Sequence, residues 1–176
     1  MRDITNYLEK PHVDKMLQIA AERSQRDYLM LWVLWRTGVR VNELIHIRPR
    51  DIEAQNKVLN VTVAKGGRMR RIPLHDETVA LLQDYIIQHE IGENEPIFPP
   101  SKQWVRGLVH RYGNQIGLDN VHPHTFRHSF AINAVRNGFD IRRLQGILGH
   151  RNLNTTAQYL QFHMRDLQEA FAKVPF

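Results

Sequence analysis

The sequence predicts an α+β protein that is mainly α-helical and contains one small antiparallel β-sheet. Three observations predict this class. Apolar residues recur with helical spacing along most of the chain. A segment near residue 60 alternates between apolar and polar residues, which is typical of a strand with one buried face. The chain has 176 residues, of which 42% are hydrophobic, so it fits one domain with a sizeable core.

Two long helices are predicted at the start of the chain. Pro11 opens the first, whose apolar residues follow the spacing of one buried helix face. The second begins at about Ser24 and is apolar all round between Leu29 and Trp35, so we expect it at the centre of the core. Gly38 ends this helix, because glycine is suited to the left-handed conformation of a helix cap.

A short helix and the sheet are expected next. The short helix carries Arg40 and Glu43 and stops before Pro49. The sheet is predicted over residues 52–74, where the best strand covers 58–63 and is followed by a turn that contains two glycines.

Most of the remaining chain is predicted to be helical. A loop rich in glycine, asparagine and proline over residues 92–96 separates the first two of these helices. The expected helices cover residues 76–89, 101–116, 125–137 and 140–148, and a tail from about residue 164.

Composition excludes several classes of site and location. The chain has no cysteine, so disulfide bonds and thiolate metal ligands are excluded, and a reducing compartment is expected. Its longest apolar run, residues 28–35, is far shorter than the roughly 20 residues of a membrane span. The N-terminus lacks the basic-then-apolar pattern of a secretion signal. We therefore expect a soluble intracellular protein that has no membrane partner.

The positive charge is unevenly distributed. Residues 1–100 carry 14 basic and 14 acidic side chains, whereas residues 101–176 carry 10 basic and 4 acidic ones. The formal net charge of +6 therefore comes entirely from the second part. Eighteen of the 24 basic residues are arginine, whose planar guanidinium matches a phosphate group. Nucleic acid is the natural partner of such a chain, although many basic proteins bind none.

The segment over residues 122–128, H-P-H-T-F-R-H, gathers several groups that can carry chemistry. Its histidines suggest a zinc site, but the segment passes from a loop into a helix, and its arginine would repel a dication. Alternatively, His124 and Arg127 project together from a helix N-terminus, where the helix dipole favours an anion. A plain helix cap at the surface is the third interpretation.

The segment over residues 37–44, T-G-V-R-V-N-E-L, places Arg40 between valines that should be buried. An arginine in such surroundings needs a partner or a function, because an unpaired buried charge is unfavourable. Glu43, three residues later, can orient it. A purely structural pair between Arg40 and Glu43 is the alternative.

The third segment runs from L-G-H at residues 148–150 to Tyr159, nine residues after the histidine. The intervening chain is too polar to form a core around Tyr159, so a half-buried tyrosine is the simplest expectation. The tyrosine gains chemical interest only if His150, the two arginines and a lysine of the sheet turn meet it.

In this order and spacing, the motifs resemble the tyrosine recombinase (phage integrase) family from about residue 12 to the tail. The matching features are the arginine of T-G-V-R-V-N-E-L, the lysine of A-K-G-G, H-P-H-T-F-R-H, L-G-H and the later tyrosine. Ala64 and Phe126 depart from the glycine and leucine common in the family, but neither carries a reactive group. The resemblance assigns catalytic roles to six residues: Arg40, Lys65, His124, Arg127, His150 and Tyr159.

The resemblance implies a site-specific DNA recombinase that cleaves and rejoins DNA through a 3′-phosphotyrosyl intermediate, without metal or ATP. Tyr159 would attack phosphorus, and His124 would accept its proton. Lys65 would protonate the leaving 5′-oxygen; apart from the resemblance it is simply an exposed lysine in a turn.

The other assigned residues would stabilise the charge that develops on the phosphate. Arg40 and Arg127 would bind its nonbridging oxygens, and His150 would add a hydrogen bond. Glu43 is expected to hold Arg40 in place.

Further basic residues are expected to contact DNA phosphates. Lys102 and Arg106 lie four residues apart and share a helix face, for which a solvated charged surface is the competing interpretation. The full predicted set is Arg68, Arg70, Arg71, Lys102, Arg106, Arg111 and Arg151.

The resemblance also implies the partners and the organisation of the protein. We expect double-stranded DNA with paired inverted-repeat sites, a chain that is monomeric in isolation and tetrameric on DNA, and a cytoplasmic location at the nucleoid. Residues 1–176 are interpreted as one C-terminal-type catalytic domain, with the N-terminal core-binding domain absent. The amphipathic tail would pack on its own core or dock on a neighbouring subunit.

Two kinds of alternative function remain open at this point. A type IB topoisomerase or a telomere-resolving enzyme would use the same chemistry on other DNA substrates. A regulator with the same fold would bind DNA without cleaving it.

Overall fold

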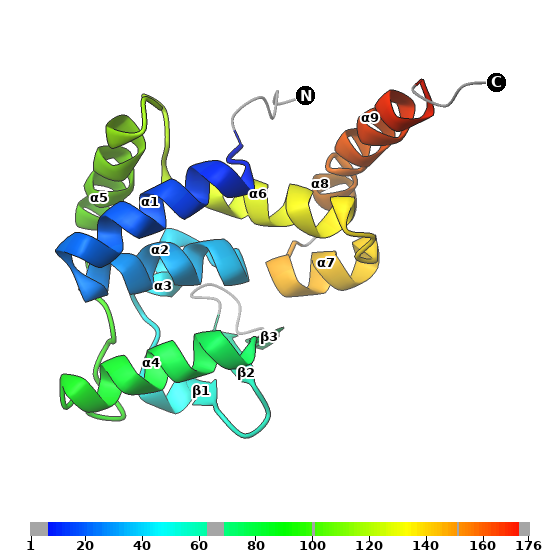
Figure 1. The fold of residues 1–176 in the computed structure, drawn as a ribbon. Coiled ribbons are helices and arrows are strands. Elements are labelled where there is room, and N and C mark those ends of the chain that lie inside the picture. The colour runs from blue at the N-terminus through cyan, green and yellow to red at the C-terminus, as the bar shows by residue number, and fades with distance from the viewer. Residues whose placement is uncertain (1–6, 63–68, 100, 151, 173–176) are drawn as a thin grey trace.

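The computed structural model describes residues 7–62, 69–99, 101–150 and 152–172, and shows a mainly helical protein with a small sheet at one side (Figure 1). This confirms the predicted fold class. The helices are α1 (Lys10–Arg23), α2 (Gln25–Thr37), α3 (Val41–Leu44), α4 (Asp76–Gln88), α5 (Lys102–Gln115), α6 (Pro123–Arg136), α7 (Ile141–Leu148), α8 (Asn154–Ala157) and α9 (Leu160–Phe171). A 3₁₀ turn η1 (Pro49–Asp51) leads into strands β1 (Ile52–Glu53), β2 (Val58–Thr62) and β3 (Met69–Pro73).

Helix α2 forms the centre of the main core, as its composition predicts. Every residue from Leu29 to Trp35 is buried, and the helix packs against α1, α4 and α6 (Figure 1). The hydroxyl of Ser24 accepts a hydrogen bond from the backbone N–H of Asp27 at 3.3 Å, which caps the helix start. Gly38 ends the helix with φ of 62°, the left-handed cap conformation.

The sheet is antiparallel in the order β1-β2-β3. Leu59 pairs with Ile72, and Val61 pairs with Arg70. These four side chains are buried, so one face of the sheet packs on the protein interior. The predicted turn after β2 lies outside the described residues.

A second, smaller core joins α6, α7 and the C-terminal segment. Its buried members are Ala131, Ile132, Val135, Leu144, Leu148, Tyr159 and Phe162. The expectation that the chain around Tyr159 is too polar to form core is therefore wrong. The aliphatic faces of α6 and α7, which are distant in sequence, supply the apolar surroundings.

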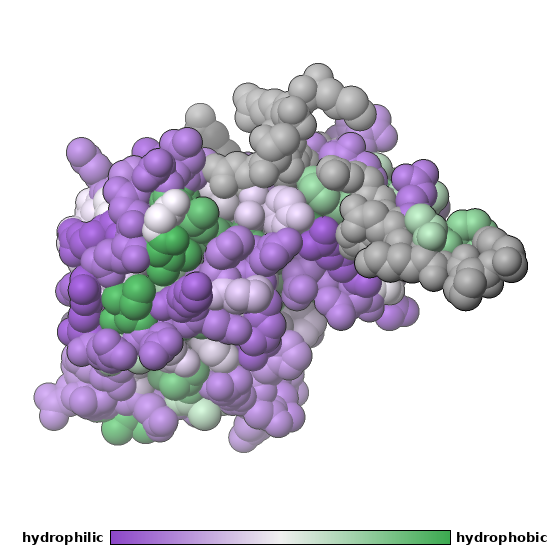
Figure 2. All heavy atoms as spheres, turned by 45° about the horizontal axis from the view of Figure 1, so that its top comes forward, coloured by the Kyte–Doolittle hydropathy of each residue, from purple (hydrophilic) through white to green (hydrophobic). Residues whose placement is uncertain are grey.

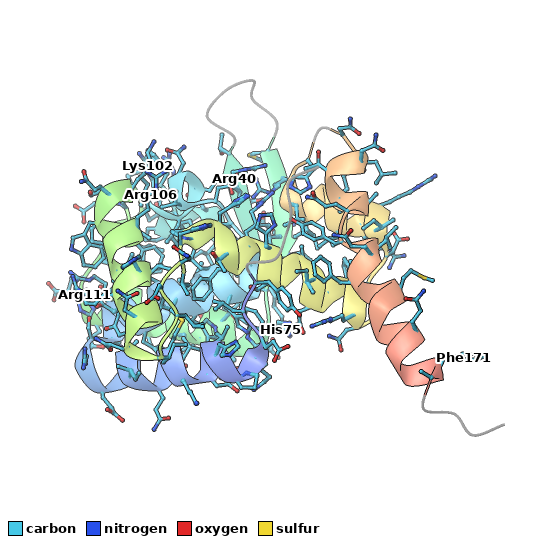
Figure 3. All side chains as sticks on the ribbon, turned by 90° about the horizontal axis from the view of Figure 1, so that it is seen from above. Arg40, His75, Lys102, Arg106, Arg111 and Phe171 are labelled. Carbon is cyan, nitrogen blue, oxygen red and sulfur yellow. The ribbon has the colours of Figure 1, made fainter. Side chains whose placement is uncertain are left out.

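The C-terminal helix begins earlier than expected. Helix α9 starts at Leu160 rather than near residue 164, and the short helix α8 precedes it. Phe162 is buried in the second core, and its ring meets that of Tyr7 at a centroid distance of 5.4 Å. Farther along α9, Met164 and Phe171 are exposed, and this end of the helix projects from the body of the protein (Figure 3).

The outer surface carries little continuous apolar area on the face shown in Figure 2, where hydrophobic residues form small separate patches among hydrophilic ones. Among the described residues, none of the helices is both long and apolar enough to cross a membrane.

Candidate active site

The two predicted catalytic arginines lie side by side where α2, α6 and α7 meet. Arg127 projects from α6 and is 1% exposed; its Nη1 donates to the Gly38 carbonyl at 2.7 Å, and its Nη2 donates to the Leu148 carbonyl. Nη1 of Arg40 donates to the same Leu148 oxygen at 3.4 Å. One carbonyl at the end of α7 therefore holds both guanidinium groups. Within the described part of the chain, Nε of Arg127 is buried and has no hydrogen-bond partner.

Two glycines lie in tight, left-handed positions beside the site. Gly38 has φ of 62°, and a Cβ there would lie 2.5 Å from the Phe130 ring. Gly149 has φ of 64°, and a Cβ there would lie 3.0 Å from Cδ of Arg70. Both positions have a left-handed backbone; a Cβ at Gly38 would overlap the Phe130 ring, whereas a Cβ at Gly149 would require the Arg70 side chain to shift slightly. They immediately precede the segments that carry Arg40 and His150.

Glu43 holds Arg40 through two contacts. Its carboxylate accepts hydrogen bonds from the backbone N–H of Arg40 at 2.7 Å and from Nη1 of Arg40 at 3.1 Å. It also forms a bidentate pair with Arg70, in which both N–O distances are 2.7 Å. Glu43 thus contacts Arg40 as expected, and it contacts a second arginine that the sequence did not connect with it.

The surroundings change the pKa values of these groups. Burial alone would raise the pKa of Glu43, but the hydrogen bonds and charge of Arg70, together with Arg40, lower it to about 2. Burial, and next to it the charge of Arg40, lowers the pKa of Arg127 to about 9. At neutral pH Glu43 is therefore an anion and Arg127 is a cation.

His150 lies beside the arginines and bonds to α8. Its Nδ1 is 2.8 Å from the hydroxyl of Thr156, which is fully buried, and Gln145 donates to its backbone carbonyl at 3.0 Å. Burial, followed by the charges of Arg127 and Arg40, lowers the pKa of His150 to about 3. The imidazole is therefore neutral at pH 7. If Thr156 donates to Nδ1, the remaining ring nitrogen carries the hydrogen and can donate to a ligand.

The histidines of α6 do not converge on a shared point. Nδ1 of His122 accepts from the backbone N–H of Thr125 at 3.2 Å, so His122 serves as the helix cap. The exposed ring of His124 packs edge-on against His128 with a centroid distance of 4.2 Å. Among the described residues there is no group of three or more histidine, aspartate or glutamate side chains that could hold a metal ion.

Tyr159 is turned into its own protomer in this structure. It is 1% exposed, and its hydroxyl lies 2.8 Å from Nδ1 of His128, one helical turn after His124. Burial raises the pKa of the phenol, while the charges of Arg127 and Arg40 act in the opposite direction. Burial, followed by the charges of His124 and Arg127, lowers the pKa of His128 to about 4. His128 is therefore neutral at pH 7, and its Nδ1 can accept a hydrogen bond from the phenol.

Of the five predicted DNA contacts that the structure describes, four are exposed and one is buried. Lys102, Arg106 and Arg111 are exposed on α5, and the first two lie near the end of this helix that is closer to Arg40 (Figure 3). Arg71 is exposed and pairs with Glu53 at 2.9 Å.

Arg70 differs from the rest. The sequence predicts an exposed phosphate contact, but in this structure the Arg70 side chain is only 8% exposed and its guanidinium pairs with Glu43. The alternation of β3 turns Arg70 inward and Arg71 outward. Lys65, Arg68 and Arg151 lie outside the described residues.

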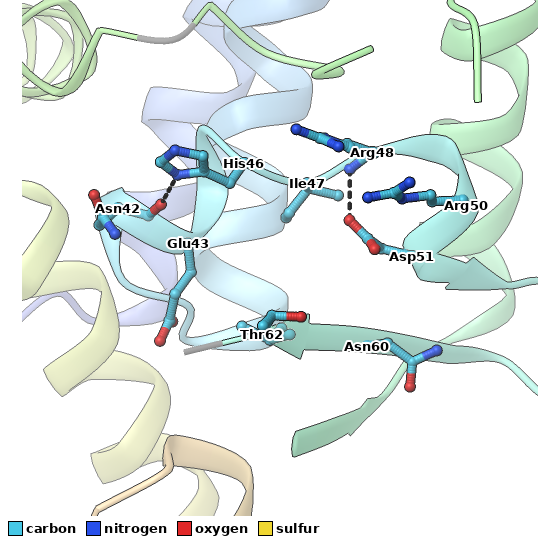
Figure 4. A pocket seen from close by; sticks show the side chains of 10 residues that line it. Asn42, Glu43, His46, Ile47, Arg48, Arg50, Asp51, Asn60 and Thr62 are labelled. Atoms are coloured by element: carbon cyan, nitrogen blue, oxygen red, sulfur yellow. Dashed lines mark hydrogen bonds between the residues drawn. The ribbon is translucent and has the colours of Figure 1, made fainter. Parts of the chain in front are cut away.

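A pocket of about 300 Å³ lies next to Glu43, between α3, η1 and β2 (Figure 4). Arg48, Arg50 and His46 line it together with Asn42 and Asn60. These basic residues belong to no motif, and only the fold shows that they line one pocket with Asn60 of β2. Thr156 lies in no motif, and His128 lies in the segment 122–128 but received no role of its own. Their contacts to His150 and Tyr159 depend on tertiary packing.

Comparison with known proteins agrees with the geometry. The sequence profile of the Phage integrase family matches residues 6–165. A tyrosine recombinase of Pseudothermotoga lettingae is 35% identical over 97% of this chain and 60% of its own length. Tyrosine recombinase XerA of Pyrococcus horikoshii is 33% identical over 98% of this chain and 62% of its own length. The chain therefore spans about three fifths of these relatives.

Solved structures show the same fold. A crystal structure of XerA recombinase superposes with a TM-score of 0.81 at 28% identity, covering 97% of this chain and 66% of the other. The catalytic domain of bacteriophage HP1 integrase superposes with a TM-score of 0.72 at 23% identity, covering 97% of this chain and 95% of the other. The resemblance carried by the arginine, histidine and tyrosine motifs is confirmed, and the chain belongs to the phage integrase family of tyrosine recombinases.

Proposed function

We propose that this chain is the catalytic domain of a site-specific DNA recombinase that breaks and rejoins DNA through Tyr159. The observation that carries the proposal is the convergence of Arg40 and Arg127 on the Leu148 carbonyl, separated from His150 only by Gly149. Two fixed cations beside a neutral histidine form a site for one phosphate group. The relatives of similar sequence are themselves named tyrosine recombinases.

The proposed cleavage is a substitution at phosphorus. The Tyr159 oxygen forms a bond to phosphorus, and the bond between phosphorus and the 5′-oxygen breaks. The phenol proton passes to His124, and Lys65 gives a proton to the leaving 5′-oxygen. The 3′-phosphotyrosyl ester preserves the bond energy, so the 5′-hydroxyl of a second strand can reverse the step without ATP.

The arginines supply the electrostatic stabilisation that the step requires. Charge grows on the nonbridging oxygens in the transition state, where the positive charges of Arg40 and Arg127 would stabilise it and His150 would donate one hydrogen bond. Arg127 is buried, but its partners are neutral carbonyls, so its positive charge is not neutralised as that of Arg70 is. Glu43 orients Arg40 before DNA binds, through contacts with its backbone and side chain. The Arg40 side chain therefore loses no further conformational entropy when the reaction begins.

Tyr159 must move before it reacts. A phenol that is 1% exposed and bonded to His128 cannot contact a phosphate at the surface. Tyr159 lies in the short link between α8 and α9, directly before the first residue of α9. Displacement of α9 would therefore also move the Tyr159 ring out of its buried position. We propose that assembly on DNA, with paired inverted repeats and four protomers, drives this displacement and so limits cleavage to the complete complex.

The test is formation of a covalent protein–DNA adduct on a nicked duplex that traps the cleaved intermediate. The duplex carries the inverted repeats that flank the gene, or a site selected from random DNA. We expect an adduct with the wild-type chain and none with Tyr159→Phe, which should bind DNA equally well.

Other outcomes would support other functions. Sequence-specific binding without an adduct would contradict cleavage and favour a regulator. Relaxation of supercoiled DNA without a specific site would favour a topoisomerase. A strict requirement for magnesium would contradict the proposed mechanism.

A further inference from the structure

We infer that Arg70 is a positioning residue for the active site: it holds Glu43 against Arg40 and fixes the end of α7 that leads to His150. This inference rests on the proposed function for its catalytic consequence. The contacts themselves are present in the DNA-free protein.

The guanidinium group of Arg70 forms its hydrogen bonds inside the protein. Nη1 and Nη2 each donate to one carboxylate oxygen of Glu43 at 2.7 Å, and Nε donates to the carbonyl of Ile147 at 2.6 Å. The side chain is 8% exposed. All three nitrogens of the planar fork therefore have protein partners, which leaves the group poorly placed to contact a DNA phosphate.

These contacts join the two parts of the site. On one side, the carboxylate that Arg70 binds also accepts from the backbone and from Nη1 of Arg40. On the other side, Ile147 precedes Leu148, whose carbonyl holds both Arg40 and Arg127. Arg70 therefore connects a strand of the sheet with the helix end that carries the L-G-H motif.

Close packing strengthens the second connection. The Arg70 side chain lies so near Gly149 that a Cβ there would be 3.0 Å from Cδ and 3.3 Å from Nη1. His150 follows directly. Any change in the path of the Arg70 side chain would thus be felt at the turn that presents His150.

A purely stabilising ion pair is the alternative role. A buried ion pair loses the hydration of both partners, so it is weak evidence for net stability. The arrangement here also orients groups beyond the pair, since Glu43 is shared with Arg40 and the Arg70 Nε bonds to α7. Orientation of the phosphate-binding groups is therefore the consequence that can be measured separately from stability.

The first experiment separates positioning from DNA contact in the full chain. Adduct formation on the nicked duplex is measured at saturating DNA, and DNA affinity is measured as a function of salt. For Arg70→Gln we expect the rate of adduct formation to fall about 10- to 100-fold. The dissociation constant and its salt dependence should stay near those of the wild type. Arg70→Lys should retain more activity than Arg70→Gln, because it keeps one cation but loses the fork.

A matched control is available in Arg36, which pairs with Glu77 at 3.4 Å between α2 and α4. Arg36→Gln removes an arginine–glutamate pair that touches none of the site residues, and it should leave adduct formation unchanged. If Arg70→Gln instead weakens DNA binding and lowers the salt slope by about 1, Arg70 is a phosphate contact and the inference is wrong. An unchanged rate at saturating DNA would also contradict it.

A second experiment requires no activity. Carbon-13 NMR of labelled glutamate follows the titration of Glu43 in the wild type and in Arg70→Gln, and nitrogen-15 NMR follows the Arg40 side chain. Without Arg70, burial still raises the pKa of Glu43 while its strongest opposing partner is gone, so this pKa should rise clearly above about 2. The Arg40 signals should shift as its acceptor loosens.

The two experiments fail in different ways. If the wild-type chain forms no adduct, the proposed function fails, yet the NMR comparison still decides whether Arg70 controls Glu43 and Arg40. An unchanged Glu43 titration in Arg70→Gln would overturn the inference even if cleavage is active. If Arg70→Gln does not fold, Arg70→Lys carries both measurements.

Discussion

At the scale of single residues, hydrogen-bond partners decide what each ionisable group can do. His150 is neutral at pH 7, so it can donate to a phosphate only through the nitrogen that carries its hydrogen. If the Thr156 hydroxyl donates to Nδ1, the hydrogen of the neutral ring is on the other nitrogen, which can then donate to a phosphate. We expect Thr156 to fix His150 in this tautomer.

Replacement of Thr156 tests this assignment. Thr156→Val keeps the shape of the side chain but removes the hydroxyl, so the His150 tautomer is no longer defined. We expect adduct formation at saturating DNA to slow by up to about 10²-fold, the effect of losing one preorganised donor. Thr156→Ser should restore most of the rate, and Thr155→Val, at the exposed neighbouring position, should have no effect. Equal rates for the two valine variants would contradict this role.

At the scale of elements, the ends of helices build the site. The α2 end supplies the Gly38 carbonyl, the α7 end supplies the Leu148 carbonyl, and Arg127 joins them. The sequence predicts both helix ends, because each has a glycine suited to a left-handed cap. It does not predict that the two ends lie together, since that depends on how α6 packs across α2.

Gly38→Ala should test the packing at the first of these ends. The left-handed backbone costs alanine about 1–2 kcal/mol, and the clash with the Phe130 ring adds about 1–3 kcal/mol of overpacking. Gly117→Ala is a matched control, because Gly117 has φ of 81° but no heavy atom within 4 Å of the added Cβ. Urea unfolding should show a clearly larger loss for Gly38→Ala. Equal losses would mean that the contact with Phe130 can relax freely.

At the scale of the whole molecule, the distribution of charge links folding to pH. The pKa values of His128 and His150 are lowered to about 4 and about 3, first of all by burial and then by neighbouring cationic groups. The unfolded chain binds protons at these histidines near pH 6.5, whereas the folded chain resists protonation. Their contribution to stability is therefore complete above pH 6.5 and is lost as the pH falls toward 4 and 3.

We expect the free energy of unfolding to decrease between pH 7.5 and pH 5, before the buried carboxylate titrates. Glu43 adds a second loss at lower pH, between its ordinary value of 4.5 and about 2. Urea unfolding at several pH values measures this directly. His128→Asn should make the dependence between pH 7.5 and pH 5 shallower, and a wild-type stability that is flat in this interval would contradict the expected shifts.

The exposed cations of α5 predict how the molecule responds to salt. A protein that contacts about 6–10 phosphates should lose roughly 10³–10⁵ in affinity between about 50 and 200 mM salt. Lys102→Gln and Arg106→Gln should each reduce the slope of affinity against salt by about 1, without changing adduct formation at saturating DNA. A slope unchanged by either variant would mean that these side chains remain in solvent.

Local patterns in the sequence determined the helices, their caps, the antiparallel sheet and the set of motif residues, because these depend on neighbours within a few positions. Only the tertiary structure decided that Arg70 turns inward to Glu43 and that Tyr159 is buried against His128. Both outcomes depend on surfaces contributed by distant segments, so the polarity of the nearby chain is a poor guide to burial. For the same reason, the sequence predicts which side chains are reactive, whereas the fold determines which of them are accessible to a substrate.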